Sequence, residues 1–386
     1  MSEKQSPAGA PALGKGAQIN ERVGIATREF IARASANRKT GRMVVALLLA
    51  FSIFAIANPR VFLNPLNLQN IGVTAPEIGI IAIAMMLAML TGGIDLSLVA
   101  IANLSAITVV SLYSGIAAND PALAESLTVP IIVAGVLVGI GCGMLNGVLV
   151  SVIGITPILA TLGTMQILNG IAIVTTGGST LYGAPESLAS FGRSGLGPVP
   201  VLFVVFLVVA VLVALLVSTT PLGRKIQLEG ANPVAARYSG ISSRSVLMST
   251  YTIGGALAGV AGVLFLARNP TASADYGASY VLLVIVIAVL GGTNPNGGFA
   301  SVAGVVLATL TLQIVSSGFT ALRLSSYEYA IAQGVILIAV MVLDAVAASR
   351  RARRPPRTAM PAATPDAPAA SPEPTPVTAQ KETEHS

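Results

Sequence analysis

The sequence has little of what catalytic centres and metal sites are built from. Its 386 residues include one cysteine, Cys142, one histidine, His385, and no tryptophan. A single cysteine excludes an intramolecular disulfide. The lone histidine and cysteine leave no residues from which a His/Cys metal cluster or a Ser–His pair can form. We therefore expect no catalytic residue, no metal site and no cofactor.

Charged residues are scarce as well. They make up 10% of the chain, compared with about 25% in soluble globular proteins, while 54% of the residues are hydrophobic and the mean hydropathy is +0.80. So few polar residues do not cover a soluble surface, and the class is a polytopic membrane protein. The net charge of +6 does not indicate a nucleic-acid partner, because the basic residues lie in the two tails and one loop.

Long apolar runs recur along the chain. A helix that spans a bilayer needs roughly 20 apolar residues, and the sequence predicts an all-α bundle of about ten such helices. The predicted spans are Met43–Ala57, Ile71–Leu90, Leu98–Ser114, Thr128–Val150, Pro157–Thr175, Val199–Val217, Val246–Ala267, Tyr280–Gly291, Phe299–Gly318 and Tyr327–Val346.

The basic residues predict the orientation. Lysine and arginine concentrate in cytoplasmic segments of membrane proteins, and ten crossings place both tails on one side with the loop 219–245. All but four of the 22 lysines and arginines fall in those segments, the exceptions being Arg60, Arg193, Arg268 and Arg323. We therefore expect both termini in the cytoplasm.

The composition divides the chain into three parts. Residues 1–41 read as a largely disordered cytoplasmic leader, 42–347 as the transmembrane domain, and 348–386 as a basic and then disordered tail. The arginines that begin the tail suit anionic membrane lipid, but they also fit the ordinary excess of positive charge on the cytoplasmic side.

The stretch Thr91–Ser97, TGGIDLS, lies between two predicted spans. A carboxylate at such a position marks function or tight pairing. Asp95 either caps the helix that follows or takes part, with Ser97, in a translocation path or its gating. Asn103 lies further along the same helix, where its amide can bond across helices.

Glu77 is a second carboxylate within an apolar region. Thr74-Ala-Pro-Glu77 has the spacing of a capping box, in which the glutamate reaches back to the first residue of a helix. The alternative is a role along the substrate path.

The basic loop from Gly223 to Ser242 carries helix signals of its own. Asn232 suits a helix cap, Pro233 the first helical position and Gly240 the end. The loop therefore predicts a short helix over residues 233–239, which either lies on the membrane surface or contacts a partner.

Glycines also recur on two predicted helices. Gly135, Gly139, Gly143 and Gly147 repeat every four residues, and Gly255 and Gly259 repeat the spacing. Stripes of small residues let membrane helices approach closely, so we expect tight packing at these positions.

Four motifs together resemble one family. TGGIDLS, the loop GRKIQLEGANPVAARYSGIS, TPILATLGTM at 156–165 and AVLGGTNPNGG at 288–298 are similar to landmarks of the ribose-permease-like permeases of bacterial sugar ATP-binding-cassette (ABC) importers, over about residues 60–344. The resemblance implies a type II ABC-importer-like bundle in the bacterial inner membrane. It also implies a segment that docks on the ATPase, with these residues: Gly223, Arg224, Glu229, Gly230, Asn232, Pro233, Ala236, Arg237 and Gly240.

The resemblance implies partners too. These are an ABC ATPase subunit, a periplasmic or extracellular sugar-binding protein, and a second permease that is identical or a sister chain. The run Gly9–Lys15 has phosphate-loop spacing, but Gly16 stands where serine or threonine is required, so ATP hydrolysis is expected on another polypeptide. The alternatives are a permease for branched-chain amino acids or nucleosides, and an ion-coupled secondary transporter.

Overall fold

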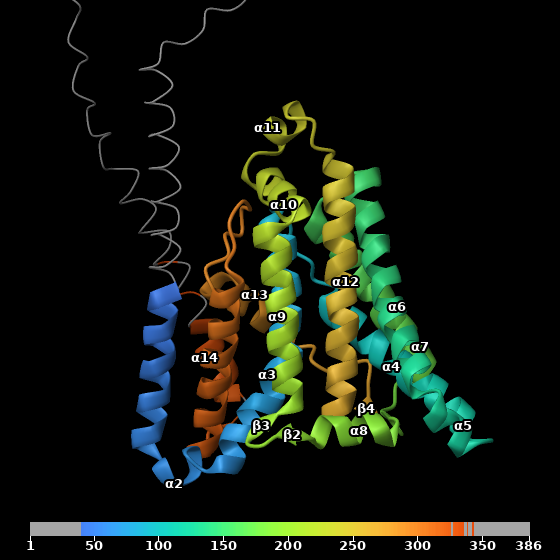
Figure 1. The fold of residues 1–386 in the computed structure, drawn as a ribbon, viewed down its shortest axis with the longest axis vertical. Helices are drawn as coiled ribbons and strands as arrows, with labels where there is room; N and C mark the ends of the chain where they lie inside the picture. The colour runs from blue at the N-terminus through green and yellow to red at the C-terminus, as the bar shows by residue number, and fades with distance from the viewer. Residues whose placement is uncertain (1–39, 326, 336–337, 339–341, 343–386) are drawn as a thin grey trace, which may run out of the picture. The chain divides into compact units, whose positions relative to one another are not determined.

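The computed structural model describes residues 40–325, 327–335, 338 and 342 of the chain. The chain divides into two units, Met1–Leu337 and Ile338–Ser386, and every element named below belongs to the first. The expected leader and tail lie almost wholly outside the described residues. Figure 1 shows that the described part is a bundle of helices.

Within the described residues, eight helices are long and apolar enough to cross a membrane. They are Thr40–Ala57, α3 (Pro65–Leu90), α4 (Leu98–Ala117), α6 (Thr128–Val148) with its π-helical extension η1 (Leu149–Ile153), α7 (Pro157–Thr176), α9 (Val201–Thr219), α12 (Ser243–Arg268) and α14 (Val302–Ala321). The shorter α13 (Tyr280–Leu290) is the predicted eighth span. The all-α polytopic class is confirmed, and the tenth predicted span is described as helix at 327–335.

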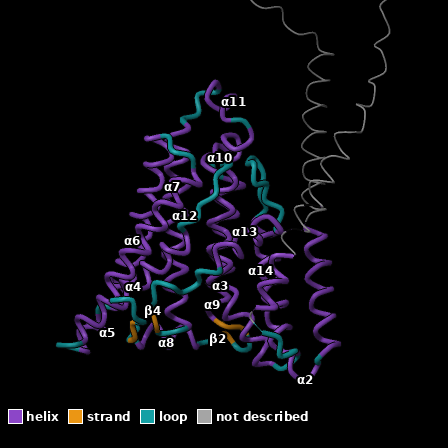
Figure 2. Tube along the Cα trace, turned by 180° about the vertical axis from the view of Figure 1, so that it is seen from behind, coloured by secondary structure: helices purple, strands orange, loops and turns teal. Residues whose placement is uncertain are grey.

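The short elements gather at the two ends of the bundle. The helices α10 (Pro221–Ala231) and α11 (Pro233–Tyr238) lie at one end, together with the loop between α13 and α14 (Figure 1). The helices α2 (Pro59–Phe62), α5 (Pro121–Ser126) and α8 (Glu186–Arg193) lie at the other end, and Figure 2 shows the same division from behind. We call these the α11 end and the α8 end.

Two small antiparallel ribbons belong to the α8 end. β1 (Leu181–Tyr182) pairs with β4 (Thr271–Ala272), and β2 (Gly195–Leu196) pairs with β3 (Val199–Pro200). Glu125 on α5 accepts the backbone N–H of Ser187 at 2.8 Å, and hydrogen bonds from Ser187 hold the pKa of the Glu125 carboxyl below its usual range. The carboxylate therefore ties the start of α8 to α5.

The core forms around α12, which packs against α6, α3 and α4. The predicted glycine stripes face each other at the contact between α6 and α12. A Cβ added to Gly139 would lie 2.6 Å from the carbonyl oxygen of Gly255 and 2.9 Å from the Cα of Gly259. The close approach expected from the glycine spacing is confirmed, and the two backbones are in direct contact.

The capping-box interpretation of Glu77 is wrong. α3 begins at Pro65, after Asn64, whose side chain accepts the backbone N–H of Leu66 at 3.0 Å. Thr74 and Glu77 therefore lie inside this helix, and Pro76 is one of its interior residues. Membrane helices accept an interior proline where neighbouring groups satisfy the freed backbone, and the sequence pattern placed the helix start too late.

Candidate functional site

The α11 end carries the predicted short helix. Asn232 Oδ1 accepts the backbone N–H of Ala235 at 3.0 Å, Pro233 begins α11, and Gly240 follows its end with a φ of 78°. The helix, its cap and its glycine end are confirmed. The sequence did not predict α10, which Thr220 caps by accepting the N–H of Gly223 at 3.1 Å.

The residues expected to contact an ATPase divide into two groups. Gly223, Glu229 and Ala236 are buried, and Glu229 accepts the hydroxyl of Ser243 at 3.0 Å, which joins α10 to α12. Arg224, Arg237 and Gly240 are exposed, as are Asn232 and Pro233. The structure also exposes Val234 by 63% and Tyr238 by 91%. An arginine and a tyrosine on a projecting helix are residue types that dominate binding interfaces.

Gly230 joins α10 to the rest of the bundle. A Cβ on Gly230 would overlap the carbonyl oxygen of Leu90 at the end of α3, and would lie 2.7 Å from the backbone nitrogen of Gly298. Gly298 in turn donates its N–H to Leu90 at 3.0 Å, and its φ is 82°. A Cβ on Gly297 would lie 2.6 Å from the carbonyl oxygen of Gly230. We call Leu90, Gly230, Gly297 and Gly298 the glycine junction. Three distant segments meet there with their backbones in close contact.

The stretch 91–97 follows the glycine junction and holds a buried polar network. Asp95 Oδ1 accepts the backbone N–H of Ser97 at 3.0 Å and the Ser97 hydroxyl at 2.6 Å. Asn146 on α6 donates to Ser97 Oγ at 2.7 Å, and Thr164 on α7 donates to Asn146 Oδ1 at 2.7 Å. Asp95 thus braces Ser97, the residue before α4, and the network extends from this turn to α6 and α7.

Two neighbours complete this network. Thr161 Oγ1 accepts the backbone N–H of Leu96 at 3.1 Å, which holds the turn against α7. A Cβ on Gly93 would lie 2.5 Å from the hydroxyl of Tyr251 on α12. That hydroxyl is buried without a hydrogen-bond partner among the described residues. The turn therefore packs between α6, α7 and α12. A charged Asp95 at this depth costs free energy unless its hydrogen-bond partners are held in place.

Replacing Thr164 by valine tests the network. The Thr164→Val variant keeps the side-chain shape but leaves Asn146 Oδ1 without its donor, which costs roughly 1–3 kcal/mol. We expect the free energy of unfolding in detergent micelles to fall by that amount. Thr175→Val on the same helix is the control, because the Thr175 hydroxyl is exposed and bonds only to Ile171 O of its own helix; its effect should stay within about 0.5 kcal/mol. Equal effects would contradict the network.

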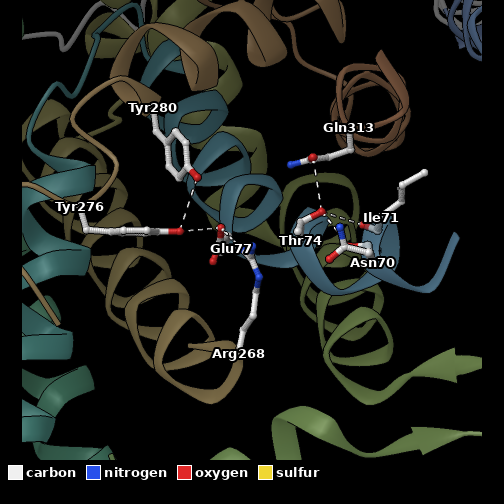
Figure 3. Close-up of polar contacts among 8 residues, drawn as sticks. All are labelled: Asn70, Ile71, Thr74, Glu77, Arg268, Tyr276, Tyr280 and Gln313. Carbon is white, nitrogen blue, oxygen red and sulfur yellow. Dashed lines mark hydrogen bonds and ion pairs between the residues drawn. The ribbon is translucent and has the colours of Figure 1, made fainter. Parts of the chain in front are cut away.

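A second polar cluster lies toward the α8 end (Figure 3). Glu77 Oε1 accepts from Arg268 Nη1 at 2.7 Å and from the hydroxyl of Tyr276 at 2.9 Å. Tyr276 stacks on Phe265, with 3.5 Å between the ring centroids, and its hydroxyl lies 3.5 Å from that of Tyr280. Arg268, the last residue of α12, therefore pairs with a carboxylate 191 positions away in the chain.

Asn103 positions this second cluster. Its amide nitrogen donates to the carbonyl oxygens of Ala274 and Tyr276, at 3.0 and 2.8 Å. These two bonds hold the segment before α13 against α4, with Tyr276 directed at Glu77 (Figure 3). Asn103 is thus a positioning residue for the tyrosine.

A cavity of about 490 Å³ opens beside the ion pair. Glu77, Arg268, Tyr280 and Gln313 line it, with Thr74 and residues of the segment 327–333. Thr74 Oγ1 lies 3.4 Å from Gln313 Oε1, and Figure 3 shows the two side chains facing each other. We call this cavity the Glu77 chamber.

The four residues expected along a path therefore fall into two sites. Asp95 and Ser97 share one network, while Glu77 and Asn103 meet through Tyr276. Sequence reasoning missed the other residues that build the two sites, which are Asn146, Thr161, Thr164, Tyr251, Arg268, Tyr276, Tyr280 and Gln313. Only Arg268 carried a signal: it is a basic residue on the expected non-cytoplasmic side, directly after an apolar run.

Comparison with known proteins gives one family match. The profile of the family described as "Branched-chain amino acid transport system / permease component" matches residues 67–342. The matched region contains both polar clusters, the glycine junction and α11. No solved structure matches the chain.

Curated relatives cover most of the chain. The D-allose transport system permease protein AlsC of Escherichia coli is 32% identical over 78% of this chain and 89% of that protein. The ribose import permease protein RbsC of Bacillus subtilis is 32% identical over 78% of this chain and 91% of that protein. The autoinducer 2 import system permease protein LsrD of Yersinia enterocolitica is 31% identical over 78% and 89%.

Proposed function

We infer, because this chain belongs to the ribose-permease family of ABC importer permeases, that it is the membrane-spanning subunit of an importer for a monosaccharide or sugar-like polyol. The observation that carries this inference is the similarity to D-allose and ribose permeases along 78% of the chain. The description of the matched family names branched-chain amino acids, but the relatives reported above are named for D-allose, ribose and autoinducer 2, and these names favour a sugar over an amino acid or a nucleoside.

The importer needs further subunits. The sequence offers no complete phosphate-binding loop, so ATP hydrolysis belongs to a separate ABC ATPase. Solute is delivered by a periplasmic or extracellular sugar-binding protein, and two permeases, identical or sister chains, enclose the path. We assign residues 1–41 to a cytoplasmic leader, 42–347 to the permease domain and 348–386 to a cytoplasmic tail near membrane lipid.

The distribution of basic residues supports the orientation. Outside the tails the two ends carry equal numbers of basic residues, which are Arg224, Lys225, Arg237 and Arg244 at the α11 end and Arg60, Arg193, Arg268 and Arg323 at the α8 end. The excess comes from the two tails, whose 14 lysines and arginines we place on the side of the α11 end. Because cytoplasmic loops are enriched in lysine and arginine, the α11 end faces the cytoplasm of a bacterial inner membrane, and both termini lie there.

The contacts of α10 and α11 support a coupling role. Val234, Arg237 and Tyr238 form an exposed surface on α11 that suits docking to the ATPase. α10 transmits a displacement of α11 to the glycine junction, which directly precedes the Asp95 turn. ATP binding then shifts the equilibrium between two arrangements of the bundle. The size of this shift in free energy is set by how much more tightly ATP binds to the transporter in one arrangement than in the other.

Reversing one charge on α11 tests this role. In the complete transporter reconstituted in vesicles, Arg237→Glu is expected to lower ATP-driven sugar uptake by about tenfold or more, the equivalent of roughly 1.4 kcal/mol. ATP hydrolysis should continue, because the substitution lies outside the ATPase. Radiolabelled sugar uptake and phosphate release, measured on the same vesicles, report the two quantities.

The control is Arg244→Glu, an exposed arginine at the start of α12 rather than on α11. It introduces the same charge change and should retain uptake. Normal coupled uptake by Arg237→Glu would remove the role assigned to α11. Sugar accumulation by the permease alone, driven by a proton gradient without ATP, would overturn the proposed function itself.

A further inference from the structure

We propose that the Glu77 chamber is a solute-binding site within the permease, which holds a neutral polyhydroxylated molecule in transit. This inference rests on the proposed function and adds the place where the solute contacts the membrane subunit. The size of the chamber is suitable, since small-molecule sites enclose about 300–1,000 Å³ and the chamber measures about 490 Å³.

The chamber presents hydrogen-bonding groups of both kinds. Arg268 offers N–H donors, Gln313 offers a donor and an acceptor, and Tyr280 offers a hydroxyl. A sugar hydroxyl donates one hydrogen bond and accepts others, so it can pair with a site that offers both donors and acceptors. An apolar solute would leave these groups unpaired at a cost of about 1–3 kcal/mol each.

One carboxylate oxygen of Glu77 takes no part in the hydrogen bonds of the cluster. Glu77 Oε1 receives both hydrogen bonds of the cluster, whereas Oε2 is buried and has no hydrogen-bond partner among the described residues. The side chain is 4% exposed, while that of Arg268 is 30% exposed and borders the cavity. A rotation of the carboxylate or of the Arg268 side chain brings Oε2 within reach of a solute hydroxyl. The hydroxyl can then donate a strong, charge-assisted hydrogen bond to Oε2.

The charges favour a neutral solute. Glu77 and Arg268 neutralise each other at 2.7 Å, and the other chamber residues named above are uncharged. A lone anion or cation would find no free counter-ion among them. An amino acid would have to separate the ion pair to match its own two charges, which is costly in a partly buried site.

The aromatic residues restrict the shape of the solute. Tyr276 is held between Phe265 and Tyr280, with its ring stacked on the phenylalanine. Tyr280 meets Tyr276 edge to face and lines the chamber. The ring of Tyr280 therefore gives the chamber a flat and rigid apolar wall, against which the C–H face of a sugar ring can lie.

Protection of an introduced cysteine tests the site directly. In the complete transporter with Cys142 replaced by serine, Gln313→Cys is labelled with a membrane-impermeant maleimide from the sugar-binding-protein side. We expect the sugar that this transporter takes up, from a panel that includes D-ribose and D-allose, to slow labelling when added without binding protein. At four times its apparent Kd, the expected slowing is about fivefold.

The controls use residues at the same end of the bundle. Ser190→Cys on α8 is exposed and should be labelled equally with and without sugar. Ser316→Cys, also in the chamber, repeats the measurement if Gln313→Cys does not assemble. Glu77→Gln in the Ser316→Cys background should abolish protection, whereas Glu186→Gln, which alters the exposed Glu186–Arg193 pair, should not.

The outcomes separate the two proposals. ATP-driven sugar uptake with protection supports the chamber. Sugar uptake without protection at either cysteine, or protection that survives Glu77→Gln, overturns the chamber and leaves the importer standing. ATP-driven uptake of L-leucine, with no uptake of any sugar on the panel, overturns the proposed function and the chamber together.

Discussion

Gly143→Leu is expected to prevent accumulation of the folded permease. A Cβ at this position would overlap the carbonyl oxygen of Tyr251 on α12 and lie 2.9 Å from the Cα of Gly255. Both neighbours are backbone atoms, so no side-chain rotation relieves the overlap. α6 and α12 would have to separate along their shared glycine stripes, which lie in the core of the bundle.

The expected effect exceeds ordinary overpacking. Extra methylene groups in a packed core cost typically 1–3 kcal/mol, but here the surrounding groups are main chain. The free energy of unfolding of a whole protein is only about 5–15 kcal/mol. Loss of the α6–α12 contact therefore removes a large part of this free energy. The measurement is the yield of monodisperse protein after detergent extraction, together with its unfolding temperature.

Gly141→Leu provides the matched control. Gly141 is on the same helix, is exposed, and has no atom within 4 Å of an added Cβ. The same substitution there should leave yield and unfolding temperature close to those of the wild type. If both variants accumulate equally, the close approach of α6 and α12 is not a requirement of the fold.

Gly230→Ala should uncouple transport from ATP hydrolysis. The added methyl group would overlap the carbonyl oxygen of Leu90, and the nearby Gly298 backbone leaves no space on its other side. α10 must therefore shift relative to the end of α3. A strain of about 1–3 kcal/mol acts on the connection between α11 and the Asp95 turn, and uptake per ATP is expected to fall about tenfold for each 1.4 kcal/mol.

Gly163→Ala is the control for Gly230→Ala. Gly163 lies in α7 with no atom within 4 Å of an added Cβ, so the same change adds a methyl group without displacing a helix. Uptake and ATP hydrolysis are measured side by side in reconstituted vesicles. Wild-type stoichiometry in Gly230→Ala would show that the glycine junction tolerates movement and does not transmit it.

The sequence alone determined the membrane class, the approximate positions of the spans and the helix α11. Each of these depends on local information. Apolar runs of bilayer length specify helices, and Asn232, Pro233 and Gly240 specify where α11 begins and ends. The glycine spacing predicted close packing, because a four-residue repeat places all its members on one helix face.

The pairing of distant groups was decided only by the tertiary structure. No local pattern links Glu77 to Arg268, Asp95 and Ser97 to Asn146, or Gly230 to Leu90, because each partner lies on a different segment. The local pattern gave a wrong prediction at Thr74 and Glu77, because these residues have the spacing of a capping box but lie inside α3. The periodicity of a sequence predicts which face of a helix is buried, but only the packing of the whole chain determines which other segment that face contacts.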